Sequence, residues 1–199
     1  MNSELFHRIK QRYGRSSSFA VWSCADADNS QGVDDLSLFD INNSTETLES
    51  LKTEYILLGL NISRSVIASD FANFHDGRRY SKDYKLRFAL RGSPLWGSYM
   101  TDVFKDIEMV DSADFERYMR AHPEIEKAQI EELRAEISEV TGQTTPKLFG
   151  LGSAATKYLR KHFSNDFEVY QLMHYSHYVS KENYRESVCR QIEQAISPK

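Results

Sequence analysis

The sequence predicts an α/β fold of three layers, in which a central, mainly parallel sheet of four strands lies between two layers of helices. Apolar runs of strand length alternate with segments of helical periodicity through most of the chain. The run at residues 55–60 is almost continuously apolar, which is typical of a strand that a parallel sheet buries on both faces. A repeated strand-helix order favours parallel strands with helices on both faces of the sheet.

Each element is predicted from its local pattern. Leu5, Phe6 and Ile9 have helical spacing, and Gly142 follows the longest predicted helix as a C-cap glycine does. The strands of the sheet are expected at residues 55–60, 97–103, 147–151 and 168–173, with a further possible strand at residues 19–24. Helices are expected at residues 4–13, 123–140 and 181–195 and after Gly152 and Ser153, and residues 26–44 are expected to form a long loop or arm.

Length and composition predict one domain. The chain has 199 residues and a hydrophobic content of 40%, which is enough for one sizeable core. We expect a single domain at residues 1–199 and a monomer, with a helix and an acidic arm in residues 1–52 and the α/β core in residues 53–196.

Two further features bear on the compartment and on partners. The longest apolar run is far shorter than the roughly 20 residues that a membrane span needs, and the N-terminus lacks the apolar core of a signal peptide. Cys24 and Cys189 do not have the spacing of a metal site. We therefore expect a cytoplasmic protein that binds no membrane, no metal and no cofactor.

The charge of the chain is unevenly distributed. The net charge is -4, which argues against indiscriminate coating of nucleic acid. Residues 25–51 contain seven acidic and no basic residues, whereas residues 77–91 contain six basic residues, one acidic residue and interleaved aromatic residues. Basic residues beside aromatic ones suit a phosphate backbone and stacked bases. The alternative for residues 77–91 is a solvated helix face whose aromatic side chains belong to the core.

Three segments resemble motifs of the uracil-DNA glycosylase superfamily. GLNIS at residues 59–63 is similar to the family's first motif, of which GINPG and GMNPG are examples, and HYSHYVS at residues 174–180 is similar to its last, HPSP followed by an intercalating residue. LFGLGSAATKYL at residues 148–159 is similar to the family's third strand and the helix that follows it. The resemblance covers about residues 53–195. It implies a uracil-DNA glycosylase-like α/β fold and an enzyme that flips uracil or another damaged base out of DNA and hydrolyses its N-glycosidic bond.

The resemblance implies catalytic roles for two residues. Asn61 matches the asparagine that positions the attacking water, and His174 matches the histidine that hydrogen-bonds a pyrimidine carbonyl and stabilises charge on the leaving base. Because a neutral asparagine cannot take the proton of the water, Asp102 and Asp70 are candidates for a general base. The alternatives are structural: Asn61 and the aspartates could cap strand or helix ends, and His174 could be a buried histidine with satisfied hydrogen bonds.

Other residues are expected to bind the base or the DNA. In the family an aromatic residue after the first motif stacks on the extruded base, and the last motif contacts phosphate and fills the gap that the base leaves. The residues expected to bind the base are Phe71 or Phe74, with His75 nearby. The residues expected to bind DNA are Ser63, Arg78, Arg79, Ser153, Ser176, His177 and Tyr178, with Val179 as the alternative to Tyr178.

The chain departs from the family at its prolines. Ile62 replaces the proline of the first motif, and Tyr175 and His177 replace those of the last. Prolines stiffen loops whose donors must be preorganised. A second function is therefore open: a relative of the same fold without glycosylase chemistry that binds a nucleobase, a nucleotide or a partner protein. The acidic residues 25–51 would suit that function, since they could lie where DNA would otherwise bind.

Overall fold

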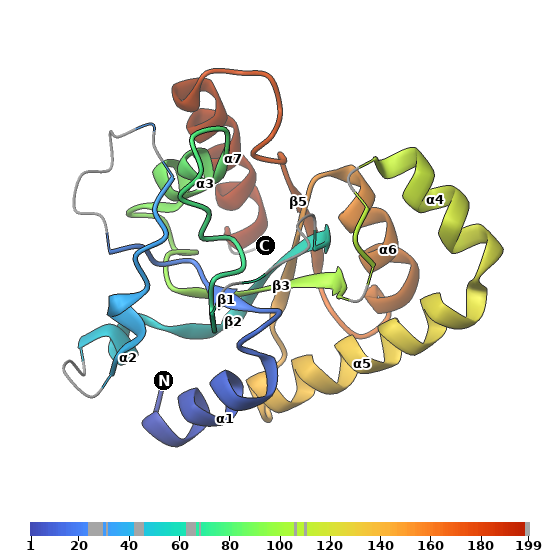
Figure 1. The fold of residues 1–199 in the computed structure, drawn as a ribbon, viewed down its shortest axis with the longest axis horizontal. Coiled ribbons are helices and arrows are strands. Elements are labelled where there is room, and N and C mark those ends of the chain that lie inside the picture. The colour runs from blue at the N-terminus through green and yellow to red at the C-terminus, as the bar shows by residue number, and fades with distance from the viewer. Residues whose placement is uncertain are drawn as a thin grey trace.

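The structure, a computed structural model, describes residues 1–23, 30, 32–41, 46–62, 67, 69–105, 107–109 and 111–197. Its centre is a five-stranded sheet with the strand order β1-β3-β2-β4-β5 (Figure 1). The strands are β1 (Ser18–Phe19), β2 (Lys52–Asn61), β3 (Ser98–Phe104), β4 (Lys147–Leu151) and β5 (Val169–Leu172). β1 is antiparallel to β3, and the other neighbouring pairs are parallel.

Helices lie on both faces of this sheet. In Figure 1, α3 and α7 lie on one side of the strands and α1, α5 and α6 on the other. The described residues form the helices α1 (Ser3–Tyr13), α2 (Glu46–Ser50), α3 (Asp83–Leu90), α4 (Ser112–Ala121), α5 (Pro123–Thr141), α6 (Ser153–Phe163) and α7 (Lys181–Ile196), and the 3-10 helix η1 (Ser37–Phe39).

The central strand β2 contributes side chains to a separate hydrophobic core on each face of the sheet. Ile56 and Leu58 pack in the cluster that contains residues of α1, α5 and α6, whereas Leu57 packs in the cluster that contains residues of α3 and α7. All three are fully buried. This explains why the run at residues 55–60 lacks the polar alternation of a half-exposed strand. Phe6 and Ile9 of α1 join the first cluster, so the N-terminal helix packs on the same core as the sheet.

The sequence predicted the mixed α/β class and the parallel strands, but not all of the elements. The sheet has five strands, not four: the further strand suggested for residues 19–24 is present only as Ser18 and Phe19, which pair with Met100 and Tyr99 at the edge of the sheet. A strand of two residues is too short to show a periodic pattern. The helix α4 was not predicted, although Asp111 marks its start by accepting hydrogen bonds from the N–H groups of Ala113 and Asp114.

The ends of the predicted helices follow the expected signals. Pro123 occupies the first turn of α5, and Gly142 ends the helix with a φ of +61°. Ser180 caps α7 by accepting a hydrogen bond from the N–H of Asn183. Among the residues that the structure describes, no helix is long and apolar enough to cross a membrane.

The strand order places a crevice beside β2. From β2 the chain passes to β3 on one side, and it later returns to β4 on the other side before continuing outward to β5. Connections that leave two adjacent parallel strands in opposite directions open a crevice at the carboxyl ends of these strands, which is where α/β proteins bind ligands. In this chain the crevice lies between the carboxyl ends of β2 and β4.

Candidate functional site

A pocket of about 320 Å³ occupies this crevice. Its walls come from the carboxyl ends of β2 and β4, from β3, from the start of α6 and from the loop after β5. The lining residues are Gly59, Leu60, Asn61, Phe74, Asp102, Met109, Leu151, Gly152, Ser153, Ala154, His174, Tyr175 and Ser176. Six residues that the sequence predicted for the site therefore line one pocket: Asn61, Phe74, Asp102, Ser153, His174 and Ser176.

The hydrogen bonds of His174 determine where its proton lies. The backbone N–H of Ser176 donates to His174 Nδ1 at 3.2 Å, and Ser176 Oγ lies 2.7 Å from the same nitrogen. A ring nitrogen that accepts an N–H carries no proton, so the neutral imidazole holds its proton on Nε2. Burial, followed by the nearby His177, lowers the pKa of His174 and favours this neutral form.

The position of His174 depends on the glycine at the start of α6. Gly152 has a φ of +90°, and a side-chain carbon added there would lie 3.1 Å from His174 Cβ. The N–H of Gly152 donates to the carbonyl oxygen of Leu172 at 2.8 Å, which ties the start of α6 to β5. The ring of His174 also stacks on Tyr175, with 4.4 Å between the ring centroids. The histidine therefore contacts both the backbone at Gly152 and an aromatic ring.

Asn61 uses its amide nitrogen to hold the loop after β3. Nδ2 donates to the carbonyl oxygens of Ile107 and Met109 at 2.9 and 2.8 Å. Two carbonyl acceptors on one side establish which end of the amide is nitrogen, so Oδ1 is the acceptor that remains for the pocket. The sequence left open a capping role for Asn61, whereas the structure shows a bond to a distant loop. This structural role uses Nδ2 and leaves Oδ1 for the expected site role.

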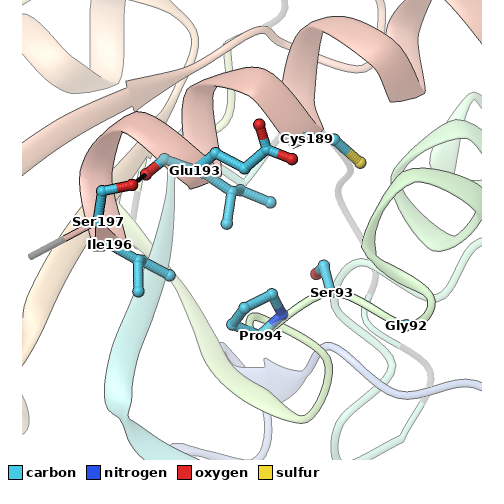
Figure 2. Close-up of a pocket in the computed structure, with 8 residues that line it drawn as sticks. Gly92, Ser93, Pro94, Cys189, Glu193, Ile196 and Ser197 are labelled. Carbon is cyan, nitrogen blue, oxygen red and sulfur yellow. Dashed lines mark hydrogen bonds between the residues drawn. The ribbon is translucent and has the colours of Figure 1, made fainter.

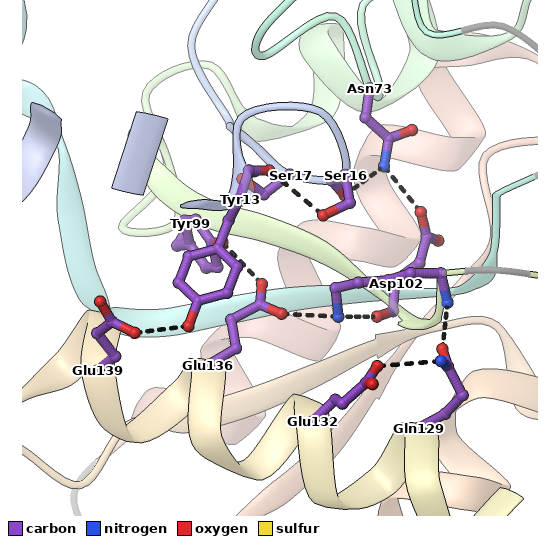
Figure 3. A network of polar contacts seen from close by, with 11 residues as sticks. Tyr13, Ser16, Ser17, Asn73, Tyr99, Asp102, Gln129, Glu132, Glu136 and Glu139 are labelled. Carbon is purple, nitrogen blue, oxygen red and sulfur yellow. Dashed lines mark hydrogen bonds and ion pairs between the residues drawn. The ribbon is translucent and has the colours of Figure 1, made fainter. Parts of the chain in front are cut away.

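Asp102 is the carboxylate that lines the pocket. It is only 3% exposed, and Asn73 Nδ2 donates to Asp102 Oδ2 at 2.8 Å and to the carbonyl oxygen of Ser16 at 2.9 Å (Figure 3). A side-chain carbon at Gly59 would lie 2.1 Å from Asp102 Oδ1, so only glycine at position 59 leaves room for this carboxylate. Asp70, the other general-base candidate, lies beside Gly14 and does not line the pocket.

A polar network behind β3 supports Asp102 (Figure 3). The Lys105 ammonium donates to the carbonyl oxygen of Asp102 at 3.1 Å and forms an ion pair of 2.7 Å with Glu136 of α5. The hydroxyl of Tyr99 donates to the same Glu136 carboxylate at 2.7 Å. Burial, and then the Glu136 charge, raises the pKa of Tyr99 well above its usual value, so the phenol stays protonated as a donor.

The sequence left open whether Phe71 or Phe74 lies in the site, and the structure gives the two residues different surroundings. Phe74 lines the pocket and has a φ of +65°, a strained conformation for a residue with a side chain. Phe71 does not line it: its ring is fully buried in the core, 5.4 Å from the ring of Phe6 and 4.9 Å from that of Phe39. The expectation that Phe71 binds a base is therefore replaced by a packing role.

His75 is also placed away from the pocket. It is 1% exposed, its Nε2 lies 3.3 Å from the carbonyl oxygen of Phe19, and its ring packs 5.1 Å from that of Trp22. The pocket wall does not include it. A histidine so enclosed acts in packing, which corrects the expectation that His75 contacts a base.

Some of the residues expected to contact DNA lie at the pocket or next to it in the chain: Ser153 and Ser176 line the pocket, and His177 and Tyr178 follow Ser176. Ser153, Ser176, His177 and Tyr178 are exposed, and the Tyr178 side chain is fully accessible, at 103% of its reference area. Ser153 opens α6, where the first N–H groups of the helix have no partner within the helix. Ser63 lies outside the described residues.

The basic segment at residues 77–91 is only partly a surface feature. Arg78, Arg79 and Lys82 are exposed, and Arg78 forms an ion pair of 2.6 Å with Asp76. In contrast, Lys85 and Arg87 are 5% and 1% exposed. The helix α3, which begins within this segment, turns them inward, so only some of the basic residues of 77–91 are available to a phosphate backbone.

A second pocket, of about 370 Å³, lies apart from this site, between α7 and the turn after α3 (Figure 2). Its lining residues are Gly92, Ser93, Pro94, Cys189, Ile192, Glu193, Ile196 and Ser197, none of which the sequence predicted for the site. Within the described part of the chain, no group of three or more histidine, cysteine, aspartate or glutamate residues is placed to hold a metal ion.

Two residues that matter to this site were not predicted from the sequence. Asn73 holds Asp102, but in FANFHDG it stands between two phenylalanines and has no distinctive spacing. Lys85 donates to two carbonyl oxygens of the loop after β5, yet in the sequence it is one cation in a run of cations.

Comparison of the chain with protein-family models, with curated proteins and with solved structures gave no significant match.

Proposed function

We propose that the pocket receives a nucleobase extruded from DNA and that the protein hydrolyses the N-glycosidic bond of this base. The observation that carries the proposal is the pairing, in one pocket, of an Asn61 acceptor with a neutral His174 whose proton is on Nε2. Hydrolysis of this bond needs an acceptor that orients water and a donor that stabilises the departing base.

The proposed reaction uses the pocket residues as follows. Asn61 Oδ1 orients a water that attacks C1′ of the sugar as the bond from C1′ to the base nitrogen breaks. The electron pair of that bond leaves with the base, and His174 Nε2–H donates to a base carbonyl oxygen on which negative charge collects. The proton released by the water passes to the Asp102 carboxylate.

The surroundings supply what base flipping requires. A flipped base loses its stacking partners, at a cost of a few kcal/mol, and Phe74 offers a ring in the pocket wall to replace them. Tyr178, fully exposed beside the pocket residue Ser176, is suited to fill the gap in the duplex. The N–H groups at the start of α6 suit the phosphate of the flipped nucleotide.

Base excision by the purified protein tests this proposal. Labelled single-stranded and double-stranded oligonucleotides would carry uracil, mismatched thymine, hypoxanthine or xanthine, and alkaline strand cleavage would report excision. We expect His174→Ala to lower kcat by about 10²- to 10³-fold, as for other lost charge-stabilising donors. His122→Ala is the matched control, because His122 bonds the carbonyl oxygen of Tyr118 and does not line the pocket. Well-folded protein that cleaves none of these substrates would contradict the proposal.

The second candidate function is binding of a nucleobase or nucleotide in the same pocket without cleavage. It is favoured by the burial of Lys85 and Arg87, which reduces the exposed positive charge. It is also favoured by the acidic arm, since Asp34 lies against Gly77, next to Arg78. Two results together would identify this function. Free bases added to the protein would shift the NMR signal of His174, and the oligonucleotides of the excision assay would be recovered intact.

A further inference from the structure

The loop that carries His174 is ordered without proline. Residues 173–180, here named the histidine loop, contain no proline. Its first residue is held from α7: the N–H of Met173 donates to Gln191 Oε1 at 2.8 Å, and the Tyr184 hydroxyl donates to the Met173 carbonyl oxygen at 3.0 Å. Its last residue, Ser180, is the N-cap of α7. These contacts hold the two ends of the loop but not its middle.

Lys85 of α3 holds the middle. Its ammonium donates to the carbonyl oxygen of His177 at 2.9 Å and to that of Val179 at 2.7 Å. The loop also closes on itself, because the N–H of His177 donates to the His174 carbonyl oxygen at 3.0 Å and the N–H of Val179 donates to that of His177 at 2.9 Å. One side chain thus reaches both turns that follow His174.

Burial of the Lys85 ammonium costs free energy, so its hydrogen bonds to the two carbonyl oxygens are needed to offset that cost. Lys85 is 5% exposed, and burial, followed by repulsion from Lys82, lowers its pKa. Two carbonyl acceptors offset that cost, and an ammonium can serve both because its three N–H donors are not coplanar. A neutral apolar side chain in the same place would leave the two carbonyl oxygens without this donor.

The helix that carries Lys85 is itself fastened to α7. The Arg185 guanidinium donates to the Phe88 carbonyl oxygen, and the Lys181 ammonium lies 4.9 Å from the centroid of the Phe88 ring. Because α7 begins where the histidine loop ends, α3, α7 and the loop form a closed set of contacts. Lys85 therefore acts from a supported position and not from a mobile surface.

We propose that Lys85 is a positioning residue that holds the histidine loop in the shape that keeps His174 Nδ1 on the Ser176 N–H and presents Nε2–H to the pocket. The role of His174 in excision rests on the proposed function, whereas the shape of the loop does not. Lys85 takes the part that prolines play in stiffening such a loop. The two hydrogen bonds from Lys85 to the histidine loop are here named the Lys85 clamp. A shift of about 1 Å in a reacting group can cost about 10²-fold in rate, so the Lys85 clamp bears directly on the proposed catalysis.

The test compares Lys85→Met, Lys85→Arg and two controls. Lys127→Met makes the same chemical change at an exposed site on α5, and Val188→Ala removes core packing from α7 while leaving the Lys85 ammonium and its two carbonyl acceptors unchanged. Hydrogen exchange of the His177 and Val179 amides and ¹⁵N NMR of the His174 ring would be measured for each, together with kcat and KM of excision.

We expect Lys85→Met to speed exchange of the two amides by at least about 10-fold and to mix the His174 tautomers. Its kcat should fall by about 10²-fold with KM changed less than about 3-fold. Lys85→Arg, which keeps the charge and several donors, should restore most of the protection, and the controls should show neither effect. Unchanged exchange and an unchanged His174 signal in Lys85→Met would overturn the clamp. If the wild type excises no base while Lys85→Met still frees the loop, the clamp stands and the proposed function fails.

Discussion

At the residue scale, His174 has its proton placed by a backbone group and not by another titratable side chain. The Ser176 N–H can only donate, so it requires an unprotonated Nδ1 for as long as the histidine loop keeps its shape. The same holds for Asn61, whose amide orientation is set by the Ile107 and Met109 carbonyl oxygens. Backbone atoms thus decide which donor and which acceptor the pocket offers.

This arrangement predicts a pH dependence. Protonation of Nδ1 would break the Ser176 bond, so excision should fall as the pH drops through the pKa of His174 in the folded protein. Burial, and then His177, lowers that pKa below its ordinary 6.5, so activity should persist at pH 6.5 and be lost at lower pH. The unfolded chain binds the proton more readily, so the stability that neutral His174 contributes is complete above 6.5 and is lost as the pH falls through the folded pKa.

The measurement is ¹⁵N NMR of the His174 ring alongside excision rates from about pH 5 to 8. The two titrations should coincide. A His174 signal that titrates above its ordinary pKa would contradict the neutral donor and with it the assigned tautomer.

At the element scale, two glycines with positive φ stand at helix ends and differ in their surroundings. Gly142 ends α5 at a φ of +61°, and a side-chain carbon there would meet nothing within 4 Å. Gly152 begins α6 at a φ of +90°, and the same carbon would meet His174. The first glycine is needed only for the backbone turn, whereas the second is needed for the turn and for the site.

Alanine at each position should separate these needs. Both Gly142→Ala and Gly152→Ala should lower the free energy of unfolding by about 1 to 3 kcal/mol, the cost of a side chain in such backbone conformations. Only Gly152→Ala should also shift the His174 NMR signal and reduce excision. Denaturant unfolding measures the first effect, and equal activity in the two variants would show that the contact with His174 does not position the ring.

At the scale of the whole molecule, the distribution of exposed charge bears on the proposed binding of DNA. The net charge is -4, and α3 buries two of the six cations of residues 77–91. The other four, Arg78, Arg79, Lys82 and Arg91, are exposed, and Arg78 is paired with Asp76. We therefore expect DNA binding with few phosphate contacts and a modest dependence on salt.

Arg79→Ala and Lys82→Ala should each reduce the slope of log K against log salt concentration by about one, with little change in base preference. Lys127→Ala, on the exposed face of α5, should leave the slope unchanged. Fluorescence anisotropy with an oligonucleotide over a range of salt concentrations measures the slope. A slope that is insensitive to both Arg79 and Lys82 would place the DNA elsewhere on the surface.

Much of the fold was readable from the chain because local patterns specify it. The continuous apolar run of β2, the proline and glycine at the ends of α5 and the glycine before α6 each act through neighbouring residues. Asn61 and His174 were expected from the resemblance of residues 59–63 and 174–180 to family motifs, and Asp102 was expected as a candidate general base. All three line one pocket because the parallel sheet brings the carboxyl ends of its strands to one edge.

Three features depended on contacts between residues distant in the sequence. Phe71 and Phe74 have the same kind of backbone conformation and lie three residues apart, yet one ring enters the core and the other the pocket. Lys85 and Arg87 look like surface cations until α3 packs on α7. The edge strand β1 exists only because Tyr99 and Met100 of β3 are there to pair with it.

The sequence by itself determined the α/β class, the main strands and helices and the order in which polar residues follow the strands, because hydrophobic periodicity and capping are local properties. Only the tertiary structure decided which polar groups share a pocket, which nitrogen of His174 carries the proton and which cations remain on the surface. The pocket and the exposed cations depend on burial and on hydrogen bonds between distant segments, such as α3 and the histidine loop, about ninety residues apart. The proton of His174 depends on a bond from the Ser176 N–H, which no hydrophobic or capping pattern in the sequence indicates.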